Sequence, residues 1–183
     1  AELAEREIDA GATDAGSLKT SLQQIAFSSQ RAAHMVNQLL AMARAEDANE
    51  ARRVLPFNLA ALATEVVHDF VPRALAKGLD LGFEGPGAKD AAAPRVVGEA
   101  VLVRELIRNL VDNALQYTPS GGTVTARVVA DPFGQVVVLQ VEDNGPGIPP
   151  AIATRLFEPF ITHGKTHGTG LGLSICKRII EDH

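Results

Sequence analysis

The sequence has one cysteine, no tryptophan, one tyrosine and no apolar run long enough to span a membrane. A single cysteine excludes an internal disulfide framework and fits a reducing compartment. The absence of a long apolar run and of a recognisable signal peptide indicates a soluble chain. A formal net charge of −5 without a basic cluster argues against nucleic acid as the main partner. The 183 residues, 46% of them apolar, can nevertheless bury a core in one or two domains.

Glycine is concentrated in two stretches, and the first is Asp143-Asn-Gly-Pro-Gly147. It follows an alternating apolar run, 136–141, which predicts a strand. Asp143 therefore lies where a strand ends, and Gly145 and Gly147 permit a sharp turn and close approach of other groups to the backbone. A carboxylate here can accept a hydrogen bond from an amine such as that of an adenine ring. Taken alone, the stretch is equally well explained as a turn.

The second stretch, Gly168-Thr-Gly-Leu-Gly172, precedes an apolar helical pattern over 171–180. Glycine-rich backbone that enters a helix presents free N–H groups and a partial positive charge, which suit phosphate. Residues 164–166 resemble the end of a P-loop, but Pro159 stands where that motif requires glycine. The dinucleotide pattern is excluded because the last glycine comes too early and no strand runs into it. The two stretches together predict a nucleotide pocket.

Glu105, Asn109 and Asn113 recur every four residues and predict a polar stripe on one face of a helix. The other side of this helix is expected to carry Leu102, Leu106, Leu110 and Ala114. Asparagine is unfavourable inside helices, so two on one face require a reason, and oxygen ligands for magnesium are one. The alternative is a solvated polar face with Asp112 as its neighbour.

The remaining pattern alternates short strands and helices. Asn58 can cap a helix that begins at Leu59, and Cys176 lies in the apolar pattern of the last helix, where burial is expected. We predict strands over 54–57, 79–83 and 95–97, a hairpin of 123–129 with 135–141, a flexible loop over 84–94 and a short helix over 149–156.

Four segments together resemble the ATP-binding domain of bacterial two-component sensor histidine kinases, in the group that also holds the gyrase, Hsp90 and MutL ATPases. Residues 105–117 resemble the N-box, 143–147 the G1 box, 157–160 the F-box and 168–172 the G2 box, in the family order. Such an ordered set is a specific signal. It implies an α+β fold, a two-layer α/β sandwich with a mixed sheet (the GHKL or Bergerat fold).

Upstream, apolar and small residues form a heptad seam that is typical of a coiled coil or a four-helix bundle. The seam consists of Leu18, Leu22, Ile25, Ser29, Ala32, Val36, Leu39 and Ala43. Residues 31–46 resemble the second helix of the dimerisation and phosphoacceptor hairpin, which implies a homodimer through the 14–47 helix. We therefore expect domains at 1–48 and 49–183. The accepting histidine is expected in an H-box outside this sequence, and His34 to be a surface residue.

The resemblance also implies roles for individual residues around ATP and Mg²⁺. Asp143 would accept from the adenine amine, Asn113 with Asn109 would hold magnesium, and Glu105 would orient or deprotonate the attacking imidazole. Lys165 would steady the terminal phosphate. The other expected nucleotide-binding residues are Tyr117, Gly145, Gly147, Ile148 and Phe160 near the nucleoside, and Gly168, Thr169, Gly170, Leu171 and Gly172 around the phosphates.

Some features depart from the family or leave alternatives open. Gln116 stands where many members carry a basic residue, and the family continues beyond His183 with another strand pair, so the sheet is expected to be incomplete. Residues 157–169 resemble the ATP lid, and His163 and His167 lack a third metal ligand. Residues 56–59 and 72–78 resemble tricarboxylate- and quorum-sensing kinases.

The resemblance implies a kinase core that phosphorylates a histidine and, through it, a response regulator. Because the H-box is absent, the sequence alone is not expected to autophosphorylate. The parent protein would reach the inner membrane through other parts, with this domain in the cytoplasm. Two other functions stay open: a non-catalytic nucleotide-binding dimerisation module, and a GHKL-type ATPase in which Glu105 activates water.

Overall fold

The computed structural model describes residues 54–87, 93–131, 133, 136–162 and 170–183, together with three helical residues, Ser21, Leu22 and Ile25. The chain divides into two compact units, Ala1–Leu40 and Ala41–His183, and almost all of the described residues belong to the second. Most of the heptad seam and His34 lie outside the described residues. So do seven consecutive residues of the expected lid and phosphate loop, 163–169, which include His163, Lys165, His167, Gly168 and Thr169.

The second unit contains a three-stranded mixed sheet and a separate pair of strands. The elements in chain order are β1 (Leu55–Asn58), α3 (Leu59–Lys77), β2 (Asp80–Glu84), β3 (Arg95–Gly98), α4 (Ala100–Tyr117), β4 (Thr123–Ala130), β5 (Val137–Asp143), α5 (Pro150–Ala153) and α6 (Gly172–Asp182). The order of the large sheet is β2-β4-β5, with β2 parallel and β5 antiparallel to β4. β1 pairs with β3 in antiparallel fashion.

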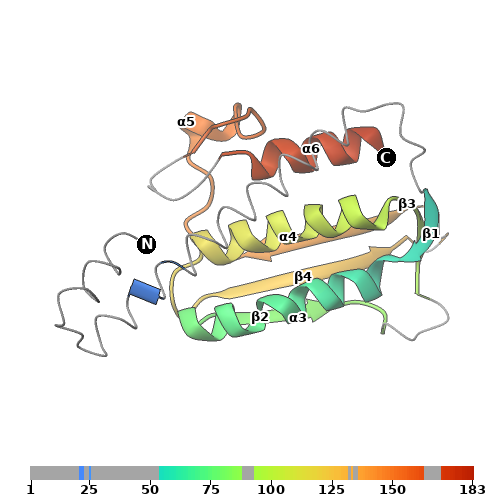
Figure 1. The fold of residues 1–183 in the computed structure, drawn as a ribbon, viewed down its shortest axis with the longest axis horizontal. Coiled ribbons are helices and arrows are strands. Elements are labelled where there is room, and N and C mark those ends of the chain that lie inside the picture. Colours follow the sequence, from blue (N-terminus) through green and yellow to red (C-terminus); the bar gives the residue numbers. More distant parts are fainter. Residues whose placement is uncertain are drawn as a thin grey trace, which may run out of the picture. The chain divides into compact units, whose positions relative to one another are not determined.

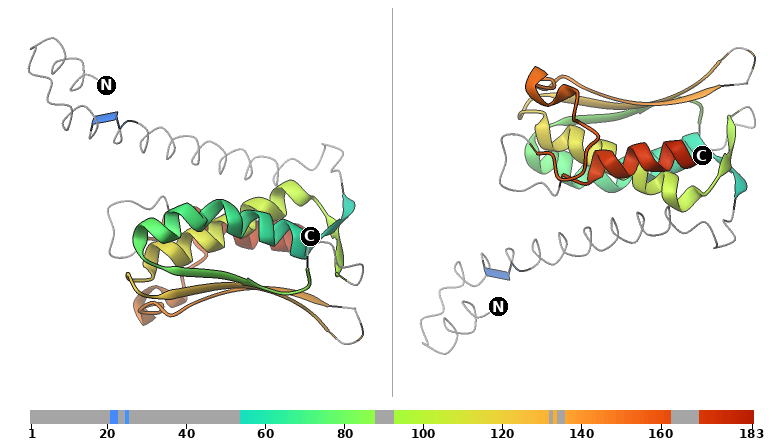
Figure 2. Two further views of the ribbon diagram at one scale, coloured as in Figure 1. Left: turned by 90° about the horizontal axis from the view of Figure 1, so that it is seen from below. Right: turned by 90° about the horizontal axis from the view of Figure 1, so that it is seen from above.

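The helices form one layer and the large sheet the other, as seen when the layers are viewed edge-on in Figure 2. Figure 1 shows α4 lying between α3 and α6 in the helix layer. This arrangement confirms the predicted sandwich with a mixed sheet. Side chains of β4 alternate as expected for a sheet that is covered by helices on one face. Val124, Ala126 and Val128 are buried, while Thr125 and Arg127 are only partly covered.

Ends of helices are fixed by specific contacts. Oδ1 of Asn58 accepts from the backbone N–H of Ala61 at 3.0 Å, which confirms the predicted cap of α3. At the far end of α6, the backbone N–H of Glu99 donates to Nε2 of His183 at 3.0 Å, and Nδ1 of His183 lies 2.8 Å from the carbonyl oxygen of Ile179. His183 therefore connects the end of α6 with the start of α4.

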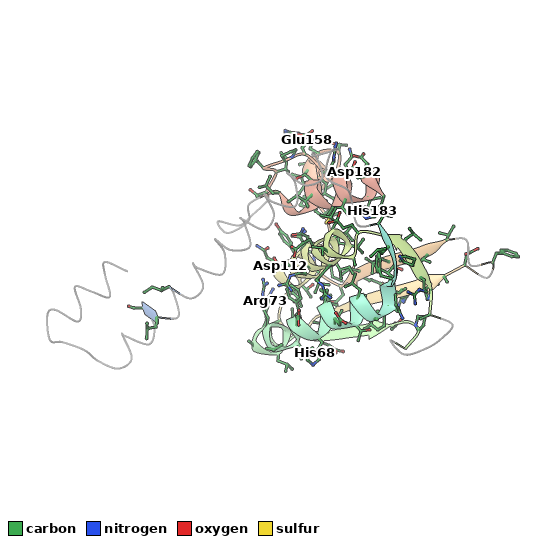
Figure 3. The ribbon with its side chains drawn as sticks, turned by 45° about the vertical axis from the view of Figure 1, so that its right-hand side comes forward. His68, Arg73, Asp112, Glu158, Asp182 and His183 are labelled. Carbon is green, nitrogen blue, oxygen red and sulfur yellow. The ribbon has the colours of Figure 1, made fainter. Side chains whose placement is uncertain are left out.

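Charged side chains also connect α3 with α4 across their exposed surface. Glu65 pairs with Arg104 at 2.6 Å and Asp69 with Arg108 at 3.3 Å. A third pair joins Arg73 of α3 to Asp112 of α4, and Figure 3 shows these two side chains next to each other. Asp112 thus faces α3 and is not part of the predicted polar stripe.

Candidate functional site

The loop after β5 packs against the end of α4. A β-carbon at Gly145 would lie in ordinary contact, at 3.4 Å, with the Cα of Thr118 and the carbonyl oxygen of Tyr117, and only 2.8 Å from Oδ1 of Asp143. Oδ1 of Asp143 accepts from the N–H of Gly145 at 2.9 Å. Oδ1 of Asn144 accepts from the N–H of Thr123 at 2.9 Å. The loop is therefore fixed by one hydrogen bond within it and by another to the first residue of β4.

Asp143 is the last residue of β5 and is exposed, as expected for a carboxylate at a strand end. Gly147 has φ of +75° and nothing within 4 Å of a built β-carbon, so open space adjoins this glycine. The side chain of Ile148 is 56% exposed and that of Tyr117 is 39% exposed. The end of β5 is therefore exposed, with open space beside Gly147 and with exposed side chains at Ile148 and Tyr117.

The polar stripe of α4 meets the first residue of α6. A β-carbon at Gly172 would lie 3.5 Å from Oδ1 of Asn109 and 3.7 Å from Nδ2 of Asn113. The structure therefore brings Gly172, the last residue of the second glycine stretch, next to the two asparagines, although Asn113 precedes it by 59 positions in the chain. Glu105 lies one turn earlier on α4 and is partly exposed.

The expectation that the apolar residues occupy the opposite side of α4 was wrong. Residues three apart on an α-helix share a face, so the stripe of Leu102 and Leu106 adjoins that of Glu105 and Asn109. Asn109 is only 2% exposed, as deeply covered as Leu102. The alternative of a solvated polar face therefore does not apply to Asn109.

Gly170, in the middle of the candidate phosphate loop, has a left-handed backbone conformation and a close neighbour that leaves no room for a side chain. Its φ is +69°, and a β-carbon there would lie 2.5 Å from the carbonyl carbon of Phe160. The side chain of Leu171 is buried in the core, and its carbonyl oxygen accepts from the N–H of Ile175 at 3.0 Å. Leucine offers no side-chain cap, so the first turn of α6 presents backbone donors that suit an anion.

Cys176, on the buried side of α6, is not part of this site. Its Sγ lies 3.7 Å from the carbonyl oxygen of Leu106, and burial raises the pKa of the thiol to about 12. Within the described residues, no group of three His, Cys, Asp or Glu side chains could hold a metal ion.

One contact that sequence reasoning missed involves Lys77. Its Nζ donates to the carbonyl oxygens of Leu115 at 2.5 Å, Gln116 at 2.9 Å and Thr118 at 2.7 Å. The only local signal is a lysine in the last turn of α3 before Gly78. Nothing in the sequence shows that its partners are carbonyls at the end of another helix.

No helix in the described part of the chain is long and apolar enough to cross a membrane.

Residues 98–183 match the family of histidine kinase-, DNA gyrase B- and HSP90-like ATPases. The chain is 36% identical over 167 residues to the sensor protein kinase PmrB of Pseudomonas aeruginosa, an alignment that covers 88% of this chain and 33% of PmrB. The chain thus spans about a third of the length of this curated relative.

Among solved structures, the nucleotide-free catalytic domain of histidine kinase ThkA is 34% identical, with a TM-score of 0.62 over 71% of this chain and 81% of that one. Full-length ShkA in complex with AMPPNP is 26% identical, with a TM-score of 0.69 over 91% of this chain and 34% of that one. The four ordered motifs, the mixed-sheet sandwich and these similarities agree. The chain belongs to the family of ATP-binding domains of bacterial two-component sensor histidine kinases.

Proposed function

We propose that this chain is the ATP-binding catalytic core of a sensor histidine kinase, which transfers the γ-phosphoryl group of ATP to a histidine and from there to a response regulator. The observation that carries the proposal is the convergence of three segments. The Asp143–Gly147 loop packs against the end of α4, and the asparagines of α4 adjoin Gly172 at the start of α6. These segments would surround the base, the metal and the phosphates respectively.

At the base end, Asp143 would accept a hydrogen bond from the adenine amine. Its carboxylate is already oriented by the N–H of Gly145. The open space beside Gly147 would admit the ring, with the exposed parts of Ile148 and Tyr117 as apolar contacts. A carboxylate that accepts from an amine discriminates against bases that carry a carbonyl at that place, because two acceptors would then face each other.

At the phosphate end, the donors would come from the backbone at the start of α6, with Gly170 and Gly172 allowing close approach. Lys165, Gly168 and Thr169 are proposed to complete this end from outside the described residues. Asn109 and Asn113 fit a magnesium site because their amide oxygens can turn toward the space beside Gly172. When bound, magnesium would neutralise phosphate charge during transfer.

Glu105 is proposed as the residue that orients or deprotonates the attacking imidazole. It lies one helical turn before Asn109 on the same stripe, so a histidine that reaches the γ-phosphate would pass close to it. Dimerisation through the 14–47 helix would hold two chains together, and the accepting histidine of the H-box, which lies outside this sequence, would be reached within that dimer. The domain division at 48 and 49, and the place of the parent protein at the inner membrane, belong to the same proposal.

The first test is calorimetric titration of this chain with Mg-ADP, beside the variants Asp143→Asn and Asp69→Asn. Asp69 carries the same charge on the surface of α3, where it pairs with Arg108, and serves as the control. We expect binding by the unaltered chain and by Asp69→Asn, and at least a tenfold weaker affinity for Asp143→Asn. Equal binding by all three proteins would contradict the proposed base contact.

Phosphoryl transfer is tested with the full-length parent protein and ATP labelled in its γ-phosphate. A kinase gives a protein-bound label that is stable to base and labile to acid, and Glu105→Gln should reduce its formation. Steady release of phosphate without labelling would instead establish an ATPase in which Glu105 activates water. Nucleotide binding without labelling or phosphate release would establish a dimerisation module.

A further inference from the structure

The last residue of α3 fixes the last turn of α4. The three hydrogen bonds from Nζ of Lys77 end on carbonyl oxygens on either side of Tyr117, at positions 115, 116 and 118. Helix C-termini leave such carbonyls without intrahelical partners and favour a nearby cation. The last turn of α4 itself contains no basic residue, so the cation is supplied by the neighbouring helix.

The turns that follow the two helices are joined as well. The N–H of Gly121 donates to the carbonyl oxygen of Gly78 at 2.8 Å, and the N–H of Asp80 donates to that of Gly122 at 2.9 Å. Immediately after these bonds, β2 and β4 begin their parallel pairing with Asp80 opposite Thr123. Lys77 therefore belongs to a junction that aligns α4 with the sheet.

This junction is in direct contact with the loop that carries Asp143. Thr118, one of the residues held by Lys77, is fully buried, and its Cα faces Gly145. Thr123, which follows the same turn, donates to Oδ1 of Asn144. A shift of the end of α4 would therefore move Tyr117 and the Asp143–Gly147 loop, the two parts of the base end of the site.

We infer that Lys77 is a positioning residue for the nucleotide site, acting through the end of α4 on the place of Tyr117 and Gly145. This inference rests on the proposed function. Nζ of Lys77 donates to backbone oxygens at the end of α4. It would thereby fix the position of Tyr117, against which the base would lie. Its removal should weaken nucleotide binding without altering the groups proposed to touch the nucleotide.

The test measures the Kd for Mg-ADP by calorimetry with Lys77→Met, Lys77→Arg and Arg104→Met, at a temperature where circular dichroism shows each variant fully folded. Arg104→Met is the matched control, because Arg104 also joins α3 to α4, at the opposite end of α4, through Glu65. We expect about a tenfold rise in Kd for Lys77→Met. Lys77→Arg, which keeps a cationic donor, should restore most of the affinity, and Arg104→Met should bind like the unaltered chain.

A second readout separates positioning from general loss of stability. Because Lys77 acts at the base end, the ratio of the Kd values with and without Mg²⁺ should be the same in Lys77→Met as in the unaltered chain. A changed ratio, an unchanged Kd in Lys77→Met, or an equal loss in Arg104→Met would overturn the inference. So would an arginine variant that binds no better than the methionine variant.

If Lys77→Met does not fold, Lys77→Gln, which retains an amide donor but no charge, replaces it under the same criteria. Failure of the unaltered chain to bind Mg-ADP would overturn the proposed function and this inference together. Normal binding by the unaltered chain and by Lys77→Met would overturn the inference alone.

Discussion

Phe160 and Gly170 both have left-handed backbone conformations, with φ of 66° and 69°, and the N–H of Phe160 donates to the carbonyl oxygen of Gly170 at 2.8 Å. The hydrogen bond ties the segment after α5 to the start of α6. A non-glycine residue in this conformation is uncommon and costs free energy, so the surrounding contacts must maintain it. Phe160 is nevertheless 74% exposed, although its backbone is in contact with Gly170 of the candidate phosphate loop.

The first prediction compares two glycines that both have positive φ. Gly121→Ala, with φ of +84° and open space around the added methyl group, should lower the free energy of unfolding by about 1–2 kcal/mol, the cost of the backbone conformation. Gly170→Ala should cost more and should also weaken Mg-ADP binding, because its methyl group would collide with the backbone of Phe160. Urea denaturation and calorimetry measure the two effects. Equal stability losses and unchanged binding would contradict the tight contact.

Removal of magnesium tests the asparagine stripe. The affinity of the unaltered chain for ADP should fall when Mg²⁺ is replaced by EDTA, and Asn113→Ala should abolish most of this difference. Asp112→Asn is the control, since Asp112 points toward Arg73 on α3. If Asn113→Ala kept the full effect of magnesium, the metal would have to bind elsewhere.

Cys176 should be unreactive in the folded protein. Its pKa is raised from 9.0 to about 12 by burial, so the folded state retains the thiol proton where the unfolded state loses it. The contribution of this group to stability is complete below pH 9 and is lost as the pH rises toward 12. A thiol reagent at pH 8 should label the protein only in denaturant. Urea denaturation at a series of alkaline pH values should show that the free energy of unfolding depends less on pH in Cys176→Ala than in the unaltered chain.

The packing of α3 on α4 should depend more on Phe70 than on the ion pairs around it. Phe70 is 8% exposed, and the guanidinium carbons of Arg108 and Arg73 lie 5.4 and 6.0 Å from the centre of its ring. We expect Phe70→Ala to lower the unfolding free energy by about 3–5 kcal/mol. Arg108→Met should cost less than about 1 kcal/mol, because its pair with Asp69 is exposed and screened. Urea denaturation measures the free energy of unfolding of both variants. Comparable losses in the two would show that the ion pairs contribute more than their exposure suggests.

Features with a local cause could be predicted from the sequence. The Asn58 cap, the β4–β5 hairpin and the position of Asp143 at a strand end follow from side-chain chemistry and alternation along a few residues. The nucleotide pocket was expected from two glycine stretches, and the comparison with kinase domains supports it.

Features that depend on tertiary pairing could not be predicted in this way. Periodicity placed Asn109 on a face of α4, but its burial follows from α6 covering that face. The role of Lys77 depends on partners 38 to 41 positions along the chain. Such contacts are decided by which helix ends lie together on the sheet, and a pattern within one helix carries no information about that.

The segment between Asn144 and Thr162 contains no buried residue, whereas α4 on one side and α6 on the other are anchored in the core. Local opening of this segment breaks few apolar contacts, so its amide hydrogens should exchange with solvent far faster than those of α4. A bound nucleotide would supply the apolar surface that the segment lacks. Nucleotide binding should therefore slow amide exchange most strongly in this segment. Ordering the segment would cost part of the binding free energy, so the measured affinity would depend on how well the segment is ordered before the nucleotide binds.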